Sequence, residues 1–225
     1  MNRWACFVAA IVCICFCAHA ENVPDNATIL FDGKDLSKWA SRKDGGEAKW
    51  KLLEDGAMEV NGTGDIVTKE KYQDFTLHVE FMTPSMPDKK GQARGNSGVY
   101  LQDRYEVQVL DSYGLQSKDD DCASIYKQKA PSVNACKPPG EWQTYDITFK
   151  AAKFDESGKK TQGARVSVVQ NGQKVIDDFE CTGPTGQGAP EGPQAGPIRL
   201  QDHGNPVRYR NIWIIASPDS SKDGK

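Results

Sequence analysis

The feature that most constrains the fold is a strict alternation of apolar and polar residues in short runs. In F-T-L-H-V-E-F (75–81), every second residue is Phe, Leu or Val, with Thr, His and Glu between them. This period of two is typical of a β-strand with one buried face. Glycine, proline, asparagine and aspartate separate such runs, and the sequence has no internal repeat or long helical pattern. We therefore predict an all-β domain, a sandwich of antiparallel strands.

The hairpin signal is strongest at Asn171-Gly172, a pair that favours a tight turn of the primed type. Three longer stretches, 84–95, 112–140 and 182–197, lack any strand pattern. Loops of that length in a compact domain are typically functional or mobile. The predicted strands are 27–31, 49–53, 56–60, 64–67, 74–83, 97–102, 104–110, 143–150, 164–170, 173–180, 196–201 and 207–215.

Residues 1–20 have the organisation of a secretory signal peptide. Arg3 gives a positive start, an apolar run extends over residues 7–17, and Ala18-His19-Ala20 supplies a cleavage site. The apolar run is too short for a spanning helix, and polar residues follow it at once. We therefore expect cleavage after Ala20 and a secreted or periplasmic protein whose mature form has no membrane span.

Residues 21–216 are expected to form one β-sandwich domain, because this length suits a single domain with a substantial core. Residues 217–225, S-P-D-S-S-K-D-G-K, are expected to be a disordered tail. The formal net charge of the chain is −3, and it contains no basic block. Nucleic acid is therefore a poor candidate for a partner. The pattern assigns no oligomeric state.

Three cysteines, Cys122, Cys136 and Cys181, follow the predicted signal. In an oxidising compartment one disulfide and one remaining thiol are expected. We predict the bridge Cys122–Cys136, because it would staple a loop that lacks strand pattern. Three reduced cysteines are the alternative. A zinc site is disfavoured, since His78 and His203 do not sit at finger-like spacing.

Several strands pair their apolar side with an unusual polar side. The run Y-E-V-Q-V (105–109) places Glu106 and Gln108 together, and a second strand places Arg199 beside Gln201. We predict that these sides assemble, with those of strands 74–83 and 207–215, into one face that holds Glu, Gln, His and Arg. Such groups bind sugar hydroxyls by donating and accepting hydrogen bonds in fixed directions. A solvated outer face with incidental salt bridges is the alternative.

The loop after strand 196–201 adds a further group to this face. Asp202-His203-Gly204 follows the strand directly, where a loop presents an imidazole and a carboxylate together.

Five motifs in order along the chain resemble those of the 3-keto-disaccharide hydrolase family. They are F-D-G-K-D-L-S-K-W (31–39), G-N-S-G-V-Y-L-Q (95–102), Y-E-V-Q-V-L-D-S-Y-G (105–114), G-E-W-Q-T-Y-D-I-T-F (140–149) and G-P-I-R-L-Q-D-H-G-N-P-V-R-Y-R-N-I-W-I (196–214). The resemblance implies a concanavalin A-like jelly-roll sandwich of two antiparallel sheets, in agreement with the strand pattern. It also implies cleavage of glycosides whose sugar carries a ketone at C3.

The same fold hosts glucanases that place acidic residues alternately along one strand. Here the comparable positions are Glu106, Gln108 and Leu110, so the second and third acids are missing. A retaining glycosidase needs two carboxyl groups about 5–5.5 Å apart. Cleavage of a 3-keto-glycoside does not need this pair of carboxyl groups, because the ketone acidifies the proton at C2. One base, one acid for the leaving oxygen, and positive charge or a metal near the C3 oxygen are sufficient.

We therefore predict that Glu106 and His203 serve as base and acid, in either order. Arg210 is expected to stabilise the enediolate. The alternative is a divalent cation held by Glu106, Asp111 and His203, the single cofactor that we consider. Asp111 contributes to the site if its strand bends or bulges. The residues expected to bind the sugar, by its hydroxyls or by stacking on its face, are Asn96, Tyr100, Gln108, Trp142, Gln201 and Asp202.

Two other functions fit the same pattern. A non-catalytic carbohydrate-binding module would use the same groups, and would bind an unoxidised glycan without forming product. A structural envelope or adhesion domain would instead hold calcium with loop acids such as Asp119, Asp120 and Asp121.

Overall fold

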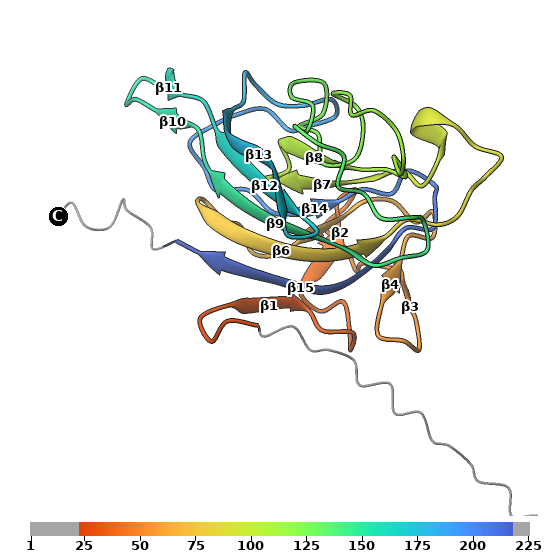
Figure 1. The fold of residues 1–225 in the computed structure, drawn as a ribbon. Coiled ribbons are helices and arrows are strands. Elements are labelled where there is room, and N and C mark those ends of the chain that lie inside the picture. Colours follow the sequence, from red (N-terminus) through yellow and green to blue (C-terminus); the bar gives the residue numbers. More distant parts are fainter. Residues whose placement is uncertain (1–22, 218–225) are drawn as a thin grey trace, which may run out of the picture.

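Two antiparallel β-sheets pack face to face to form a sandwich (Figure 1). The computed structural model describes residues 23–217. The predicted signal peptide, residues 1–20, and positions 218–225 of the predicted tail lie outside the described residues. Within 23–217, no helix is long and apolar enough to cross a membrane.

The larger sheet has eight strands in the order β13-β12-β9-β6-β15-β4-β3, and β1 pairs with β15 beside this path. Asn171 and Gly172 join β12 to β13 with φ angles of 51° and 79°, which confirms the predicted primed turn. The strands are β1 (Thr28–Phe31), β3 (Lys51–Leu52), β4 (Met58–Glu59), β6 (Phe75–Met82), β9 (Gln143–Lys150), β12 (Arg165–Gln170), β13 (Gln173–Glu180) and β15 (Arg208–Ala216).

The smaller sheet has five strands in the order β2-β5-β14-β7-β8. Its strands are β2 (Trp39–Ser41), β5 (Ile66–Thr68), β14 (Arg199–Leu200), β7 (Ser97–Leu101) and β8 (Tyr105–Val109). A separate two-stranded sheet joins β10 (Lys153–Phe154) to β11 (Lys160–Gln162), and one 3-10 turn, η1, covers Gly91–Ala93. The sequence pattern missed β2, β10 and β11, which have two or three residues each.

The apolar sides of the strands meet between the two sheets, as predicted. Phe81 of β6 packs on Tyr145 of β9 with ring centroids 4.5 Å apart. Tyr105 of the smaller sheet contacts Phe149 of the larger sheet at 5.6 Å, so these rings join the two layers. The inward-facing residues of both sheets are almost completely buried. Their burial fixes the opposite side of each strand as an outer face.

The prediction of one common polar face is wrong. Strands β6 and β15 belong to the larger sheet, whereas β8 and β14 belong to the smaller sheet. Because the apolar sides of both sheets point inward, their polar sides point away from each other. The molecule therefore has two polar outer faces, and only the face of the smaller sheet carries Glu106.

Candidate active site

Glu106 lies on β8 where the neighbouring strand β7 leaves room for its side chain. Tyr100 is the cross-strand partner of Glu106, and Gly98 is the partner of Gln108. A Cβ atom at Gly98 would collide with Oε1 of Glu106 and would lie 3.1 Å from Cε2 of Tyr100. The missing side chain at Gly98 therefore allows the Glu106 carboxylate to lie across the strand, beside Tyr100.

The Glu106 carboxylate is buried with little compensation for its charge. Its side chain is 3% exposed, and the Tyr100 hydroxyl donates a hydrogen bond of 2.9 Å to Oε2. Burial raises the pKa of Glu106 to about 7; the Tyr100 hydrogen bond and the Arg199 charge lower it, and Asp65 raises it. Both protonation states are accessible near neutral pH, so this carboxyl group is suited to taking up and returning a proton.

Glu106 lines a hollow of about 90 Å³ on the outer face of the smaller sheet. Glu106 and Gln108 come from β8, Tyr100 from β7, and the exposed His203 from the loop after β14. The structure thus brings together six residues that the sequence pattern predicted. They are Asn96, Tyr100, Glu106, Gln108, Gln201 and His203.

Three loops complete the hollow, one from each stretch that lacks strand pattern. Residues 84–95 contribute Gln92, residues 112–140 contribute Tyr126, and residues 182–197 contribute Gly186 and Gln187. The last loop is tied over the β7–β8 turn, since backbone hydrogen bonds join Thr185 to Arg104 and Ala189 to Asp103. The sequence signal for these residues was the absence of pattern, which located the loops but not the side chains.

Three amide side chains of the hollow share one property. Oδ1 of Asn96, Oε1 of Gln108 and Oε1 of Gln201 are buried, and no protein group donates a hydrogen bond to them. A buried acceptor without a donor costs free energy, so native proteins rarely keep three in one place. Their convergence on one hollow indicates a binding site for a ligand with several hydrogen-bond donors, such as sugar hydroxyls.

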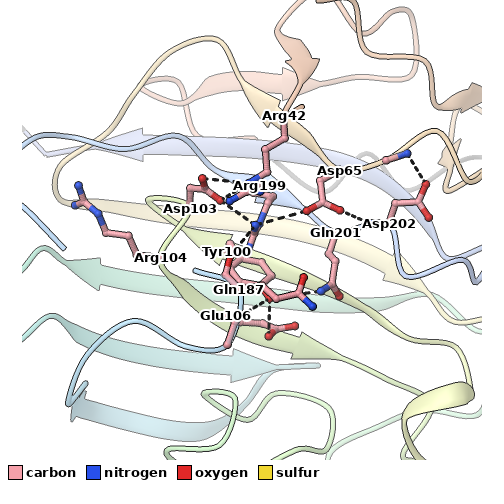
Figure 2. A network of polar contacts seen from close by, with 12 residues as sticks. Arg42, Asp65, Tyr100, Asp103, Arg104, Glu106, Gln187, Arg199, Gln201 and Asp202 are labelled. Atoms are coloured by element: carbon pink, nitrogen blue, oxygen red, sulfur yellow. Dashed lines mark hydrogen bonds and ion pairs between the residues drawn. The ribbon is translucent and has the colours of Figure 1, made fainter. Parts of the chain in front are cut away.

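A cluster of charged residues around the buried Arg199 lies beside Tyr100 (Figure 2). The guanidinium of Arg199 lies on the ring of Tyr100, with Cζ 3.3 Å from the ring centroid. Arg199 is 1% exposed and is held by Asp103 at 3.1 Å and Asp65 at 3.5 Å. Arg42 pairs with Asp103 in turn, at 2.9 Å. The sequence pattern placed Arg199 on a polar face but did not assign it to the site.

Asp202 shapes the loop that presents His203. Its Oδ1 accepts a hydrogen bond from the Gly204 backbone and its Oδ2 one from the Gly64 backbone, at 3.0 and 2.9 Å. Its own backbone N–H donates to Asp65 (Figure 2). Asp202, predicted to bind sugar, is absent from the walls of the hollow, and its contacts are those of a loop-forming residue.

Two predicted site residues lie on the opposite face of the molecule. Arg210 is on β15 of the larger sheet, where it pairs with Glu80 and lies 4.0 Å above the ring of Trp142. Assigning Arg210 to the Glu106 site, and Trp142 to stacking on its sugar, was therefore wrong. The alternation shows on which side of a strand a residue lies, but not in which sheet the strand lies.

The predicted metal ligands do not form a cluster. Asp111 follows the end of β8 and pairs with Arg94 at 3.1 Å, outside the walls of the hollow that hold Glu106 and His203. Among the described residues, no group of three or more His, Cys, Asp or Glu is placed to hold a metal ion. The assignment of Asp111 to the site, and of these three residues to a cation, is therefore not supported by their positions.

The predicted disulfide partners are neighbours but are not bonded. Cys122 and Cys136 are both free, and the Gln170 amide lies 3.5 Å from the first thiol and 3.4 Å from the second. Cys122 also contacts the Tyr145 hydroxyl at 3.0 Å. The sequence correctly placed the two side chains together, but the bridge itself is absent.

A β-sandwich with a polar hollow and a buried carboxyl group inside it fits a carbohydrate-active enzyme, which is the class that the known relatives of the chain support. The chain belongs to the family of 3-keto-alpha-glucoside-1,2-lyase-like domains, whose model matches residues 26–215. The resemblance found in the sequence is thereby confirmed.

Comparison with individual proteins supports this family membership. The chain is 27% identical to a 3-keto-disaccharide hydrolase of Bacteroides thetaiotaomicron, across 84% of this chain and 78% of the relative. It is similar to a crystal structure of a candidate glycosyl hydrolase from Parabacteroides distasonis, with 44% identity, a TM-score of 0.80, and coverage of 86% and 85% of the two chains. A second such protein from that organism, at 21% identity and a TM-score of 0.65 over 86% and 94% of the chains, shows the fold alone. The predicted sandwich is confirmed.

Proposed function

We propose that the protein cleaves 3-keto-glycosides by removing the C2 proton, eliminating the C1 substituent and adding water. One observation carries this proposal: among the described residues that line the hollow, Glu106 is the single carboxylate. Ordinary glycosidases of the common mechanisms need a pair of carboxyl groups. Elimination next to a ketone needs one base and one acid, which Glu106 and His203 supply.

In the first step, Glu106 acts as the base. Tyr100 occupies Oε2 by its hydrogen bond, so Oε1 takes the C2 proton. The electron pair of the C2–H bond passes to the C3 oxygen and forms an enediolate. The C1–O bond then breaks, the leaving oxygen takes a proton from His203, and a C1=C2 double bond remains. His203 is exposed, and this position at the mouth of the hollow suits a group that meets the leaving alcohol.

Hydration reverses the proton transfers. Water adds to C1 and gives a proton to His203, and Glu106 returns its proton to C2. The products are the free 3-keto sugar and the alcohol, which is a net hydrolysis. In place of Arg210, the Arg199 cation behind Tyr100 favours negative charge at Glu106 and on the enediolate.

A carbohydrate-binding module without catalysis is the second candidate. The three amide oxygens favour it equally, because they recognise hydroxyl groups whether or not a reaction follows. The carboxyl group with a pKa near 7 favours the enzyme, since binding alone does not need a group that exchanges protons near neutral pH.

Product analysis in deuterated water distinguishes the enzyme from the binding module. The protein is incubated with a 3-keto-glucoside and with its unoxidised parent, each with and without a chelator. We expect cleavage of the keto compound alone, with deuterium at C2 of the sugar product, at the same rate in both conditions. A rate that falls with chelator would transfer the role of Arg199 to a divalent cation. Binding of the parent glycan without cleavage of either compound would replace the enzyme by the binding module.

A further inference from the structure

Gln92 connects Asn96 and Gln108, two of the three amides of the hollow whose side-chain oxygens lack a donor. Its side-chain Nε2 donates a hydrogen bond of 2.7 Å to the backbone carbonyl of Asp120. Its Oε1 accepts from Nδ2 of Asn96 at 3.0 Å and from Nε2 of Gln108 at 3.1 Å. Nδ2 of Asn96 also donates to the backbone carbonyl of Gln92, at 2.7 Å. One side chain on η1 therefore contacts groups from two separate segments of the site.

These contacts fix the direction of each amide. A backbone carbonyl only accepts hydrogen bonds, so Asp120 requires the NH₂ group of Gln92 to point toward it. The Gln92 oxygen must then face Asn96 and Gln108, which in turn present their NH₂ groups to it. Their own oxygens then point away from Gln92. Both oxygens are buried and receive no hydrogen bond from the protein, and both residues line the hollow. The orientation is thus set by the backbone and passed on through Gln92.

We propose that Gln92 is a specificity-determining positioning residue, which makes this part of the hollow accept only hydrogen-bond donors. The proposal rests on the proposed function, in that the ligand is a sugar. Asn96 and Gln108 then read the hydrogen atoms of sugar hydroxyls and reject groups that only accept, such as a ketone, an ether or a fluorine. The C3 ketone of the substrate points away from these amides, and sugars alkylated or acylated at the recognised hydroxyls are excluded.

Deoxy and deoxyfluoro analogues test this directly, because fluorine keeps an acceptor but removes the hydroxyl hydrogen. Binding is measured by calorimetry in the Glu106→Gln variant, in which turnover is expected to be at least ~100-fold slower. The probes are methyl 3-keto-glucoside, the unoxidised methyl glucoside, and their analogues changed at C2, C4 or C6. At the positions read by Asn96 and Gln108, we expect the deoxy and the fluoro compounds both to bind at least ~10-fold more weakly. Fluoro analogues that bind as tightly as their parents at every position would overturn the proposal.

Two substitutions then assign the effect to Gln92. Gln92→Leu removes the acceptor that orients Gln108 and lets this amide turn, so the penalty for the fluoro analogue at the position read by Gln108 should fall to within ~3-fold. Asn96 still donates to the backbone carbonyl of residue 92, so the discrimination at its position should remain. Gln92→Glu keeps an acceptor for both amides and should retain the discrimination, even though its contact with Asp120 is lost. A general loss of packing would weaken all probes alike in both variants. A Gln92→Leu protein that discriminates like its parent would contradict the role of Gln92.

The failure of this inference differs from the failure of the proposed function. Cleavage of the 3-keto-glucoside, with no change of discrimination in Gln92→Leu, refutes the inference alone. Discrimination that depends on Gln92, without any cleavage, refutes the enzyme and leaves the inference standing. If no probe binds, both are refuted.

Discussion

Glu80 and Glu106 are two buried glutamates on opposite outer faces of the sandwich, and their surroundings differ. Glu80 is 6% exposed, and both of its carboxylate oxygens have partners, Arg210 on one and Asn211 on the other at 2.8 Å. Glu106 is 3% exposed and receives one described hydrogen bond, from the neutral Tyr100 hydroxyl. Both glutamates are therefore buried, but only Glu80 has a cation that directly compensates its charge. A buried carboxylate whose charge is not compensated, such as Glu106, is ready to bind a proton.

The loops explain why the two faces differ. On the larger sheet, the outward residues of β9 and β12 remain partly exposed, as the alternating burial of these strands indicates. On the smaller sheet, every residue of β7 and β8 is buried, although one side of each strand faces outward. The segments around Tyr126 and Gly186 lie over that side and form the walls of the hollow. The same strand pattern thus gives a partly exposed outer face along β9 and β12 of one sheet, and a covered site on β7 and β8 of the other.

The largest expected difference between the two glutamates is in the turnover of a 3-keto-glucoside. Glu106→Gln should lower kcat at least ~100-fold, because the amide cannot take up the C2 proton. Glu80→Gln, the matched control, should leave kcat within ~3-fold and cost about 1 kcal/mol of stability through its ion pair with the half-exposed Arg210. Steady-state kinetics and urea unfolding of both variants measure these effects. Equal losses of activity in the two variants would remove the distinction between the faces.

The second prediction concerns stability. Here Glu106→Gln is expected to raise the free energy of unfolding relative to wild type, as a gain rather than a loss. Burial raises the pKa of Glu106 from 4.5 to about 7, so between these values the folded protein holds a proton that the unfolded chain has lost. Stability must then fall as pH rises through this window. Glu106→Gln removes the titrating group, and its stability relative to wild type should rise by up to about 3 kcal/mol between pH 4 and pH 8.

Urea unfolding of both proteins at each pH gives this difference. A difference that does not change with pH would mean that Glu106 is not perturbed by burial. The expected gain also explains why the site is costly: the group suited to proton transfer at neutral pH destabilises the fold that carries it.

The sequence allowed prediction of the long strands and of much of the site, because alternation is a local property. Tyr100, Glu106 and Gln108 follow from the period of two on adjacent strands, and Gln201 and His203 from the end of the next strand. These residues stand together because the β7–β8 pairing joins segments close in sequence.

The errors have one physical cause, which is the long-range assembly of the sheets. Arg199 and Arg210 both alternate with apolar neighbours, but β14 joins the smaller sheet and β15 the larger. No local pattern separates these outcomes, so the wrong arginine was assigned to the site. Gln92 was missed for a related reason, because its loop has no period from which the direction of a side chain follows.

The smallest effect tests how the covered face makes room for its carboxylate. In Gly98→Ala, the new Cβ would occupy the place of Oε1 of Glu106, so the carboxylate must move. We expect kcat to fall ~10-fold and stability to decrease by about 1–3 kcal/mol, as for other overpacked sites. Gly183→Ala, in the loop 182–197, serves as the control and should change neither, because a Cβ atom at Gly183 would meet no other atom within 4 Å.

A double-mutant cycle separates displacement of Glu106 from general damage by Gly98→Ala. If the alanine acts by moving the Glu106 carboxylate, it should reduce the residual kcat of Glu106→Gln by less than ~2-fold, because the group it displaces no longer transfers a proton. If it damages the site in another way, the same ~10-fold loss should appear in both backgrounds. Additive effects would therefore place the requirement for Gly98 in strand packing, and strongly non-additive effects would place it in the proton-transfer step.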